Sequence, residues 1–249
     1  MKIEQIVRVP YTTRPTMIRN NESVYNISPD PEYIRQKKHQ LLMFDNALYG
    51  ETEDAVKNDL VRRAATYLSV PITTDIVEFS FNFEEDVAIL HQGVLSAICF
   101  CFPSSWTPGA GLGKSLRELH APVADGELLV KASDKIASTI SDFSQGSFRR
   151  YVWTITKVPS LSNYEKITEQ YKDEDLDINT LFMRIETQTT LPLPNGAIAL
   201  FFVKVDVLPL KDVWYRYKNL LLQSLSSMSD NIIRYKNLGE IRSYLLSVA

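Results

Sequence analysis

Cysteine is scarce in this chain. Only Cys99 and Cys101 occur among 249 residues, and one residue separates them. If their segment is a strand, both side chains point to one face, but neighbours along one strand are poorly placed to form a disulfide. Because there is no Cys-x-x-Cys pair, the sequence indicates neither a zinc site nor the disulfide framework of a secreted protein. We therefore expect a protein of a reducing compartment, located in the cytoplasm.

Long apolar runs and an excess of positive charge are also lacking. No run approaches the ~18 apolar residues of a membrane span, and the first residues, MKIEQIVRVPY, lack the continuous apolar core of a signal peptide. The 27 Lys and Arg residues are outnumbered by 30 Asp and Glu residues, which gives a net charge of −3. We expect no membrane and no nucleic acid among the partners, since nucleic-acid binding needs a basic surface.

The remaining composition is that of a globular protein. Hydrophobic residues make up 45% of the chain and charged residues 23%. A chain of this length buries roughly 70–75% of the surface that its unfolded form exposes, so folding needs no disulfide or structural metal. The sequence contains no internal repeat, and we predict a single domain over residues 1–249.

Hydrophobic periodicity and capping residues predict a mixture of helices and strands. Asp30 and Pro31 have the pattern of an N-cap followed by the first helical residue. We expect helices over residues 32–46, 52–70, 112–121 and 127–143, and again from Lys211 onward. Segments rich in β-branched and aromatic residues predict strands over residues 76–83, 87–93, 94–102, 149–157, 182–191 and 197–208. Asn195-Gly196 suggests a tight connection before the last of these strands.

The order of these elements predicts the fold class. Helices and strands do not alternate regularly, as they would around a parallel sheet. The class is therefore α+β, with a mainly antiparallel sheet, flanking helices and a helical C-terminus.

Residues 108–115, PGAGLGKS, nearly match a phosphate-binding loop. Gly113, Lys114 and Ser115 fit the end of that motif, but Pro108 stands where the first glycine is needed. Proline has no backbone N–H and a fixed φ, which damages the turn that cradles phosphate. The pattern favours a glycine-rich connection with a solvated Lys114 over a nucleotide-hydrolysing site.

His120 is one of only three histidines and lies in the predicted helix 112–121. At ~100° per residue, Leu112, Leu116, Leu119 and His120 fall within an arc of about 100°. A histidine on such a stripe is either a core residue with satisfied ring nitrogens or a ligand to a metal or haem. The pattern alone leaves both interpretations open, and the core residue is the more common of the two.

The residues around His120 carry a resemblance. Residues 100–124, FCFPSSWTPGAGLGKSLRELHAPVA, are similar to the signature of the haem-dependent oxidative N-demethylase family. The matching pieces are Phe102-Pro103-Ser104, Trp106, Gly113 and Leu119-His120-Ala121-Pro122-Val123. Ala124 departs from the second proline of that signature.

Three further segments resemble the family in the same order. FEEDVAIL matches at Glu85-Asp86, FRRYVW at Arg150 and Trp153, and MRIETQTTLPLPNGAIALFFVKV at Arg184, Glu186 and Gln188. Val152 replaces the asparagine of the family, and the usual second arginine falls at or near Pro192. The resemblance covers about residues 35–225, and residues 211–249 form a C-terminal helical extension.

The resemblance implies a PAS-like haem-binding fold with His120 as the proximal ligand of the iron of heme b (haem). It implies that the protein uses O2 to remove a methyl group from a small alkylamine, with release of formaldehyde. The electrons are expected from a separate reductase that contains flavin and an iron–sulfur cluster and is fed by NADPH. This chain has no Gly-x-Gly-x-x-Gly fingerprint and no cysteine cluster, so it cannot supply them itself.

The segment 182–190 provides the candidate catalytic residues. If it is a strand, Arg184, Glu186 and Gln188 share one face, which is either a catalytic group or an ordinary solvated stripe. In the catalytic interpretation, Glu186 is the acid–base group or holds a cationic amine. Arg184 then pairs with Glu186 or with a haem propionate, and Gln188 orients either one.

The cofactor-binding candidates are His120, Trp106, Lys114 and Arg150. Trp106 has the bulk and the N–H to wall a haem edge, although a core aromatic needs no such role. Adjacent strand residues face opposite ways, so only one of Arg149 and Arg150 reaches a propionate, and the family match selects Arg150.

Two other functions remain open from the sequence. One is a haem-binding PAS-like sensor that does not turn over. The other is a haem oxygenase that acts on a different small substrate, since Ala124, Val152 and Pro192 depart from the family pattern.

Overall fold

The computed structural model describes residues 2–26, 28–171, 175–194 and 196–248. One seven-stranded sheet has the order β1-β5-β6-β7-β3-β4-β2, and every neighbouring pair is antiparallel. The strands are β1 (Ile18–Arg19), β2 (Tyr49–Glu51), β3 (Asp86–His91), β4 (Val94–Cys99), β5 (Phe148–Thr156), β6 (Phe182–Pro192) and β7 (Ile198–Pro209).

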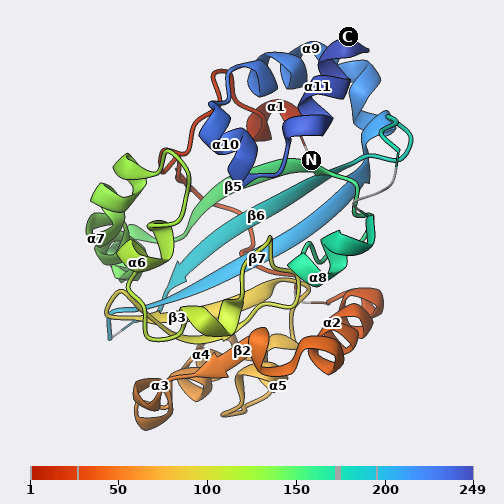
Figure 1. Cartoon of the computed structure of the whole chain (residues 1–249). Coiled ribbons are helices and arrows are strands. Elements are labelled where there is room, and N and C mark those ends of the chain that lie inside the picture. Colours follow the sequence, from red (N-terminus) through yellow and green to blue (C-terminus); the bar gives the residue numbers. More distant parts are fainter. Residues whose placement is uncertain (1, 27, 172–174, 195, 249) are drawn as a thin grey trace.

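Helices surround this sheet (Figure 1). The α-helices are α1 (Ile3–Ile6), α2 (Pro31–Phe44), α3 (Glu53–Lys57), α4 (Leu60–Leu68), α5 (Ile76–Ser80), α6 (Leu116–His120), α7 (Glu127–Ser141), α8 (Glu165–Thr168), α9 (Leu210–Ser226), α10 (Asp230–Tyr235) and α11 (Gly239–Ser247). Short 3-10 turns are η1 (Asp45–Ala47), η2 (Pro108–Gly111), η3 (Phe143–Gln145) and η4 (Glu169–Tyr171). Helices α2–α5 gather beside β3 and β2, and α9–α11 lie beside β5 and β6 (Figure 1).

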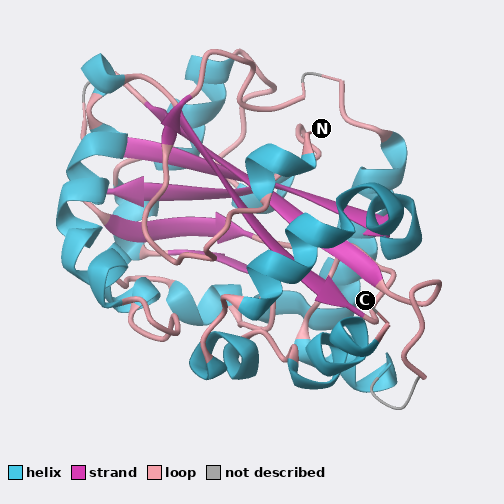
Figure 2. Ribbon diagram, turned by 90° about the horizontal axis from the view of Figure 1, so that it is seen from above, coloured by secondary structure: helices cyan, strands magenta, loops and turns pink. Residues whose placement is uncertain are grey.

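Two apolar clusters hold the helices on the sheet. One joins α4 and α5 to β3, β4 and β7, and the other joins α1 and α9–α11 to β5 and β6. A smaller cluster around Leu90, Ile140 and Ala199 holds α7. The view from above shows helices on both sides of the strands, which change direction across the molecule as a twisted sheet requires (Figure 2).

The predicted α+β class, with an antiparallel sheet, flanking helices and a helical C-terminus, is confirmed. The predicted start of α2 is also confirmed, because the Asp30 side chain accepts a hydrogen bond from the backbone N–H of Glu32 at 2.9 Å, with Pro31 as first residue. The turn predicted at Asn195 lies outside the described residues, although β6 and β7 pair as expected, from Phe182 opposite Pro209 to Pro192 opposite Ala199.

Two predicted elements were wrong, and two short strands were missed. The single helix over 52–70 is two helices, α3 and α4, because Asp59 takes a left-handed conformation (φ 52°) between them. Residues 76–83 do not form a strand: Asp75 caps α5 by accepting from two backbone N–H groups, and Phe79 and Phe83 are buried in the core. Strands β1 and β2 were not predicted, because two or three residues show no period.

The helix around His120 is shorter than predicted. It begins at Leu116, where Ser115 and Glu118 form a capping box, and Gly113 takes a positive φ of 76° before it. Leu112 therefore lies outside the helix, and the four-residue stripe is not a helical stripe. Among the described residues, none of the helices is long and apolar enough to cross a membrane.

Candidate functional site

A cavity of about 730 Å³ lies against the sheet, between α6, α7, residues 8–17 and the end of α10. All seven candidate residues line it, although they come from five separate parts of the chain: His120, Trp106, Lys114, Arg150, Arg184, Glu186 and Gln188. Its size lies in the range of small-molecule and cofactor sites.

His120 ends α6 and faces α7 across a single hydrogen bond. Its Nδ1 lies 3.0 Å from Ser133 Oγ, and the Ser133 hydroxyl donates its own proton to the carbonyl of Leu129 at 3.0 Å. Because that proton is committed, Ser133 accepts from His120, so Nδ1 carries the hydrogen and Nε2 keeps its lone pair. Burial, with a smaller effect of the Arg150 charge, lowers the pKa of His120 to about 4. The imidazole is therefore neutral at pH 7.

Glu186 lies in the middle of β6 and is held by three side chains. Its Oε1 accepts from Ser104 Oγ at 2.6 Å and from Arg184 Nη1 at 2.8 Å, and its Oε2 accepts from Gln188 Nε2 at 2.9 Å. Burial raises the pKa of Glu186, but the Arg184 charge and the hydrogen bonds from Ser104 and Gln188 outweigh it, so the net pKa lies below the usual range. Glu186 is thus ionised at neutral pH.

The polar face of β6 is covered rather than solvated. Arg184 is 1% exposed, and its Nη2 donates to the Phe102 carbonyl at 2.6 Å. The strand period brings Arg184, Glu186 and Gln188 together as predicted, and the solvated-stripe interpretation is wrong.

Arg150 lies opposite Gln188 in the β5–β6 register and lines the cavity. Burial lowers the pKa of Arg150, and the charges of Glu186 and Tyr11 oppose that effect. No hydrogen bond or ion pair to another described residue compensates its guanidinium, whereas the neighbouring Arg149 binds Glu22 and the Ser23 carbonyl. An uncompensated cation at the wall of a cavity favours an anionic ligand group.

Trp106 and Lys114 lie where α6 meets β4. Trp106 is 36% exposed and stacks edge-on against Phe100, with ring centroids 6.0 Å apart. Lys114 is exposed. Hydrogen bonds from Ser115 lower the pKa of Glu118, and the Lys114 charge adds a smaller effect in the same direction. Both line the cavity, in positions that suit its rim rather than its floor.

Sequence reasoning missed four residues of the site: Tyr11, Ser104, Ser133 and Lys236. Ser133 orients His120, and Ser104 binds Glu186. Lys236, just after α10, donates from Nζ to the Trp153 carbonyl at 3.0 Å and lies 5.7 Å from the centre of the Tyr11 ring. Burial lowers the pKa of Lys236 to about 8, an effect that Glu186 opposes. Ser104 stood in a matched motif, but no local pattern indicated the other three.

Both cysteines and His91 lie outside the lining of the cavity. Cys99 and Cys101 are free, buried thiols with Sγ atoms 3.9 Å apart, and neither lines the cavity. His91 Nδ1 contacts Asp54 Oδ2 at 2.6 Å. In the glycine-rich segment, Gly109 packs against the Asn46 carbonyl, which a Cβ would meet at 2.4 Å. This close packing leaves no room for a phosphate at Gly109. The antiparallel sheet also differs from the parallel sheet of a nucleotide-binding fold.

Haem fits the residues that line the cavity. Over the described part of the chain, no group of three or more His, Cys, Asp or Glu side chains is placed to hold a bare metal ion. A single imidazole with a free Nε2 suffices for haem iron. The uncompensated Arg150 cation suits a propionate, and apolar side chains suit the porphyrin: Leu90, Leu116, Leu119, Leu129, Ile136, Ile140, Phe148 and Phe201.

Comparison with known proteins agrees with this arrangement. A family model described as haem-dependent oxidative N-demethylase, alpha subunit-like, matches residues 31–246. The match runs past residue 225 and includes most of the C-terminal helices. No curated protein matches the chain. The protein is therefore a member of the haem-dependent oxidative N-demethylase family, of the alpha-subunit-like type.

Proposed function

We propose that this chain binds haem b in the cavity, with His120 as axial ligand, and oxidatively removes a methyl group from a small alkylamine. The observation that supports this most is the position of His120. Its neutral ring directs Nδ1–H to Ser133 and leaves Nε2 free beside a cavity that also contains the ionised Glu186. Metal-bound histidines are oriented in this way by a hydrogen bond from the second ring nitrogen.

Three further residues would hold the cofactor. Arg150 would bind a propionate, since its guanidinium has no hydrogen-bond or ion-pair partner among the described residues. Trp106 and Lys114 would close the outer edge, the first by apolar contact and the second as a solvated cation. The apolar side chains around His120 would keep water from the iron.

When bound, haem would supply oxidation of the methyl C–H bond with O2, two electrons and two protons. The hydroxymethyl amine so formed breaks its C–N bond to give the shorter amine and formaldehyde, and the second oxygen atom leaves as water. The electrons are proposed to come from a separate NADPH-fed flavin and iron–sulfur reductase. Only two cysteines occur in this chain, fewer than a protein-bound cluster of four thiolates needs.

The residues of β6 would bind and orient the amine. Among the described residues, Glu186 Oε2 accepts a hydrogen bond from Gln188 alone, so it has capacity for a substrate N–H. Because Glu186 stays ionised, its role is that of an acceptor or base rather than of an acid. Arg184 and Gln188 hold the carboxylate in place from either side along the strand.

The experiment is an absorption spectrum followed by a product assay. We expect the purified protein to show a Soret band that His120→Ala weakens or shifts, and to form formaldehyde from a methylated amine when reductase, NADPH and O2 are supplied. A band that His120→Ala leaves unchanged would contradict the ligand assignment. A stable ferrous–oxygen spectrum without formaldehyde would instead support the sensor.

The domain and location are part of the same proposal. Both large apolar clusters pack on one continuous sheet, which supports a single haem domain over residues 1–249. The two free thiols support a reducing compartment, and we propose the cytoplasm.

A further inference from the structure

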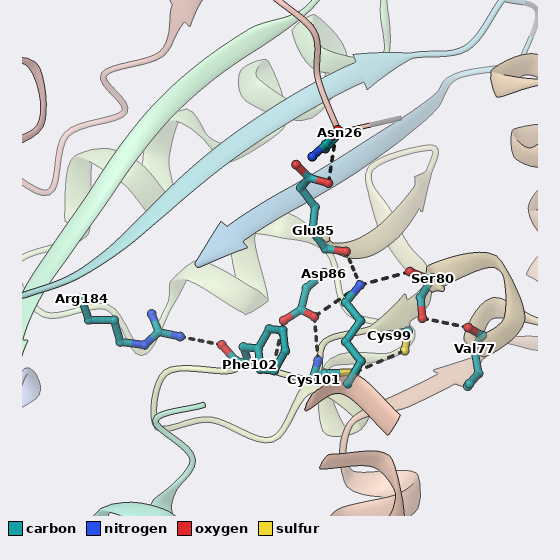
Figure 3. A network of polar contacts seen from close by, with 10 residues as sticks. Asn26, Val77, Ser80, Glu85, Asp86, Cys99, Cys101, Phe102 and Arg184 are labelled. Atoms are coloured by element: carbon teal, nitrogen blue, oxygen red, sulfur yellow. Dashed lines mark hydrogen bonds and ion pairs between the residues drawn. The ribbon is translucent and has the colours of Figure 1, made fainter. Parts of the chain in front are cut away.

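A second polar network lies behind Arg184, and its members Lys37, Asp86 and Cys101 do not line the cavity. The backbone of Phe102 is at its centre: its carbonyl accepts from Arg184 Nη2 at 2.6 Å, and its N–H donates to Asp86 Oδ2 at 2.8 Å. The N–H of Cys101 donates to the other oxygen of Asp86 at 2.9 Å. Figure 3 shows Asp86 beside the Phe102 peptide, with Arg184 directed at its carbonyl from the other side.

Residues 101–104, which Asp86 holds, influence Glu186 by two routes. Through the Phe102 carbonyl they fix Arg184, which binds Glu186 Oε1 at 2.8 Å. Two residues later, Ser104 Oγ donates to the same oxygen at 2.6 Å. Both donors to Oε1 thus depend on the path of residues 101–104.

Arg184 has few other contacts that would keep it in place. Among the described residues, its buried Nε has no hydrogen-bond partner, and its guanidinium donates to Glu186 and to the Phe102 carbonyl. If that carbonyl turns away, the guanidinium loses one of its two acceptors, and nothing else directs Nη1 at Glu186.

Asp86 is itself charged and enclosed. It is 1% exposed, and its counter-charge is Lys37 of α2, which is 0% exposed and has its Nζ 4.0 Å from Asp86 Oδ1. Lys37 also donates to the carbonyls of Ser80 and Glu85. Burial of such a pair is costly unless both members are hydrogen-bonded, as they are here. Packing of apolar side chains alone would not require a buried Lys37–Asp86 ion pair at this position.

We propose that Asp86 is a positioning residue for Glu186, acting through residues 101–104, with Lys37 as its counter-charge. This assignment rests on the proposed role of Glu186 in the active site. In this proposal Asp86, which does not line the cavity, helps to keep Glu186 ionised.

The test measures the pKa of Glu186 by 13C NMR of protein labelled at glutamate, with Glu186→Gln to assign the signal. Asp86→Asn should raise the pKa of Glu186 by about one unit or more, the size of effect that one lost cationic or hydrogen-bonding partner produces. The direct effect of removing a nearby negative charge has the opposite sign, so it would lower the pKa. The direction of the shift therefore separates positioning from simple electrostatics.

Glu84→Gln is the matched control. The Glu84 side chain is 5% exposed and pairs with Lys204, so its loss also breaks a partly buried acid–lysine pair. Among the described residues, neither Glu84 nor Lys204 has a hydrogen bond or ion pair to residues 101–104. We expect the pKa of Glu186 to stay within about 0.3 units in this variant. An equal shift in both variants would overturn the proposal, because it would reflect general loosening.

A double variant covers the case in which Asp86→Asn does not fold. Lys37→Met with Asp86→Asn leaves no unpaired buried charge, which is the tolerated way to remove such a pair. The same rise in the Glu186 pKa is expected, and an unchanged value in the folded double variant would overturn the proposal.

An activity measurement then separates this proposal from the proposed function. Asp86→Asn should lower kcat for formaldehyde by about 10-fold or more with an unchanged Soret band. If the wild type forms no formaldehyde, the proposed function fails, and the NMR result still decides the role of Asp86.

Discussion

Ser133 Oγ accepts the hydrogen bond of His120 Nδ1 at 3.0 Å, because its own proton is committed to the Leu129 carbonyl. Ser133 of α7 thus sets the tautomer of His120, which ends α6. This leaves Nε2 as the only basic atom that His120 offers to the cavity, and under the proposed ligand role of His120 it would make Ser133 a determinant of haem binding.

Ser133→Ala is expected to weaken haem binding. Removing the acceptor of Nδ1–H frees the ring to rotate and lowers its basicity, and loss of such a partner typically costs about 10–100-fold in affinity. The measurement is a titration of apoprotein with haem followed by the Soret band. Ser141→Ala, on the same helix but bonded to its own Ala137 carbonyl, is the control and should bind as the wild type does. Equal affinity in the Ser133 variant would contradict the orienting role.

Arg150→Gln is expected to weaken haem binding without changing the ligand of the iron. The cation would be lost from a propionate, and a charged hydrogen bond contributes about 1.5–3 kcal/mol, or roughly 10–100-fold. The shape of the Soret band should persist while the dissociation constant rises. Arg149→Gln removes the adjacent charge, which already pairs with Glu22, and should have little effect. If Arg149→Gln instead weakened haem binding more than Arg150→Gln, the propionate would be assigned to Arg149.

Lys236 should make the stability of the protein depend on pH. Burial lowers its pKa to about 8 from an ordinary 10.5, so the folded state binds this proton less tightly than the unfolded chain does. Its contribution to stability is therefore present at high pH, declines as pH falls below the ordinary value, and is lost once pH passes below about 8.

The comparison of wild type with Lys236→Met isolates this effect. Between about pH 7.5 and about pH 9.5, the free energy of unfolding of the wild type should rise relative to the variant by about 2 kcal/mol, in urea titrations at both pH values. Lys211→Met, at an exposed position of α9, should show no such change. A constant difference between wild type and the Lys236 variant would mean that Lys236 is not desolvated.

Phe79→Ala should destabilise the fold by about 3–5 kcal/mol, the usual loss for an aromatic side chain in a packed core. Phe79 is 0% exposed and its ring lies 5.1 Å from that of Phe83, centre to centre. Urea unfolding measures the change, and Val56→Ala, at a side chain that is 65% exposed, is the control. A loss below about 1 kcal/mol would show that α5 does not hold this part of the core.

The alternation along β6 was predictable because it is local. Side chains two apart on a strand share a face, so Arg184, Glu186 and Gln188 had to lie together once the segment was extended. The N-cap at Asp30 was predictable for the same reason, since a capping side chain binds a backbone N–H only two residues away.

Residues 76–83 show where local preference fails. Their β-branched and aromatic side chains favour a strand, but Asp75 supplies an N-cap for α5, which buries Ile76 and Phe79 in the same cluster as Phe83. Such preferences amount to about 1 kcal/mol or less per residue, so the packing of the core decides the conformation.

By itself the sequence determined the fold class, the polar face of β6 and the family, because each depends on short periods or on motifs read in order. Only the tertiary structure decided that Ser133 orients His120, that Lys236 joins the cavity and that Asp86 supports Glu186 through residues 101–104. Lys236 and the Trp153 carbonyl, for example, are separated by 83 residues. Contacts at such separations follow from how the helices pack on the sheet, and no local pattern of side chains encodes them.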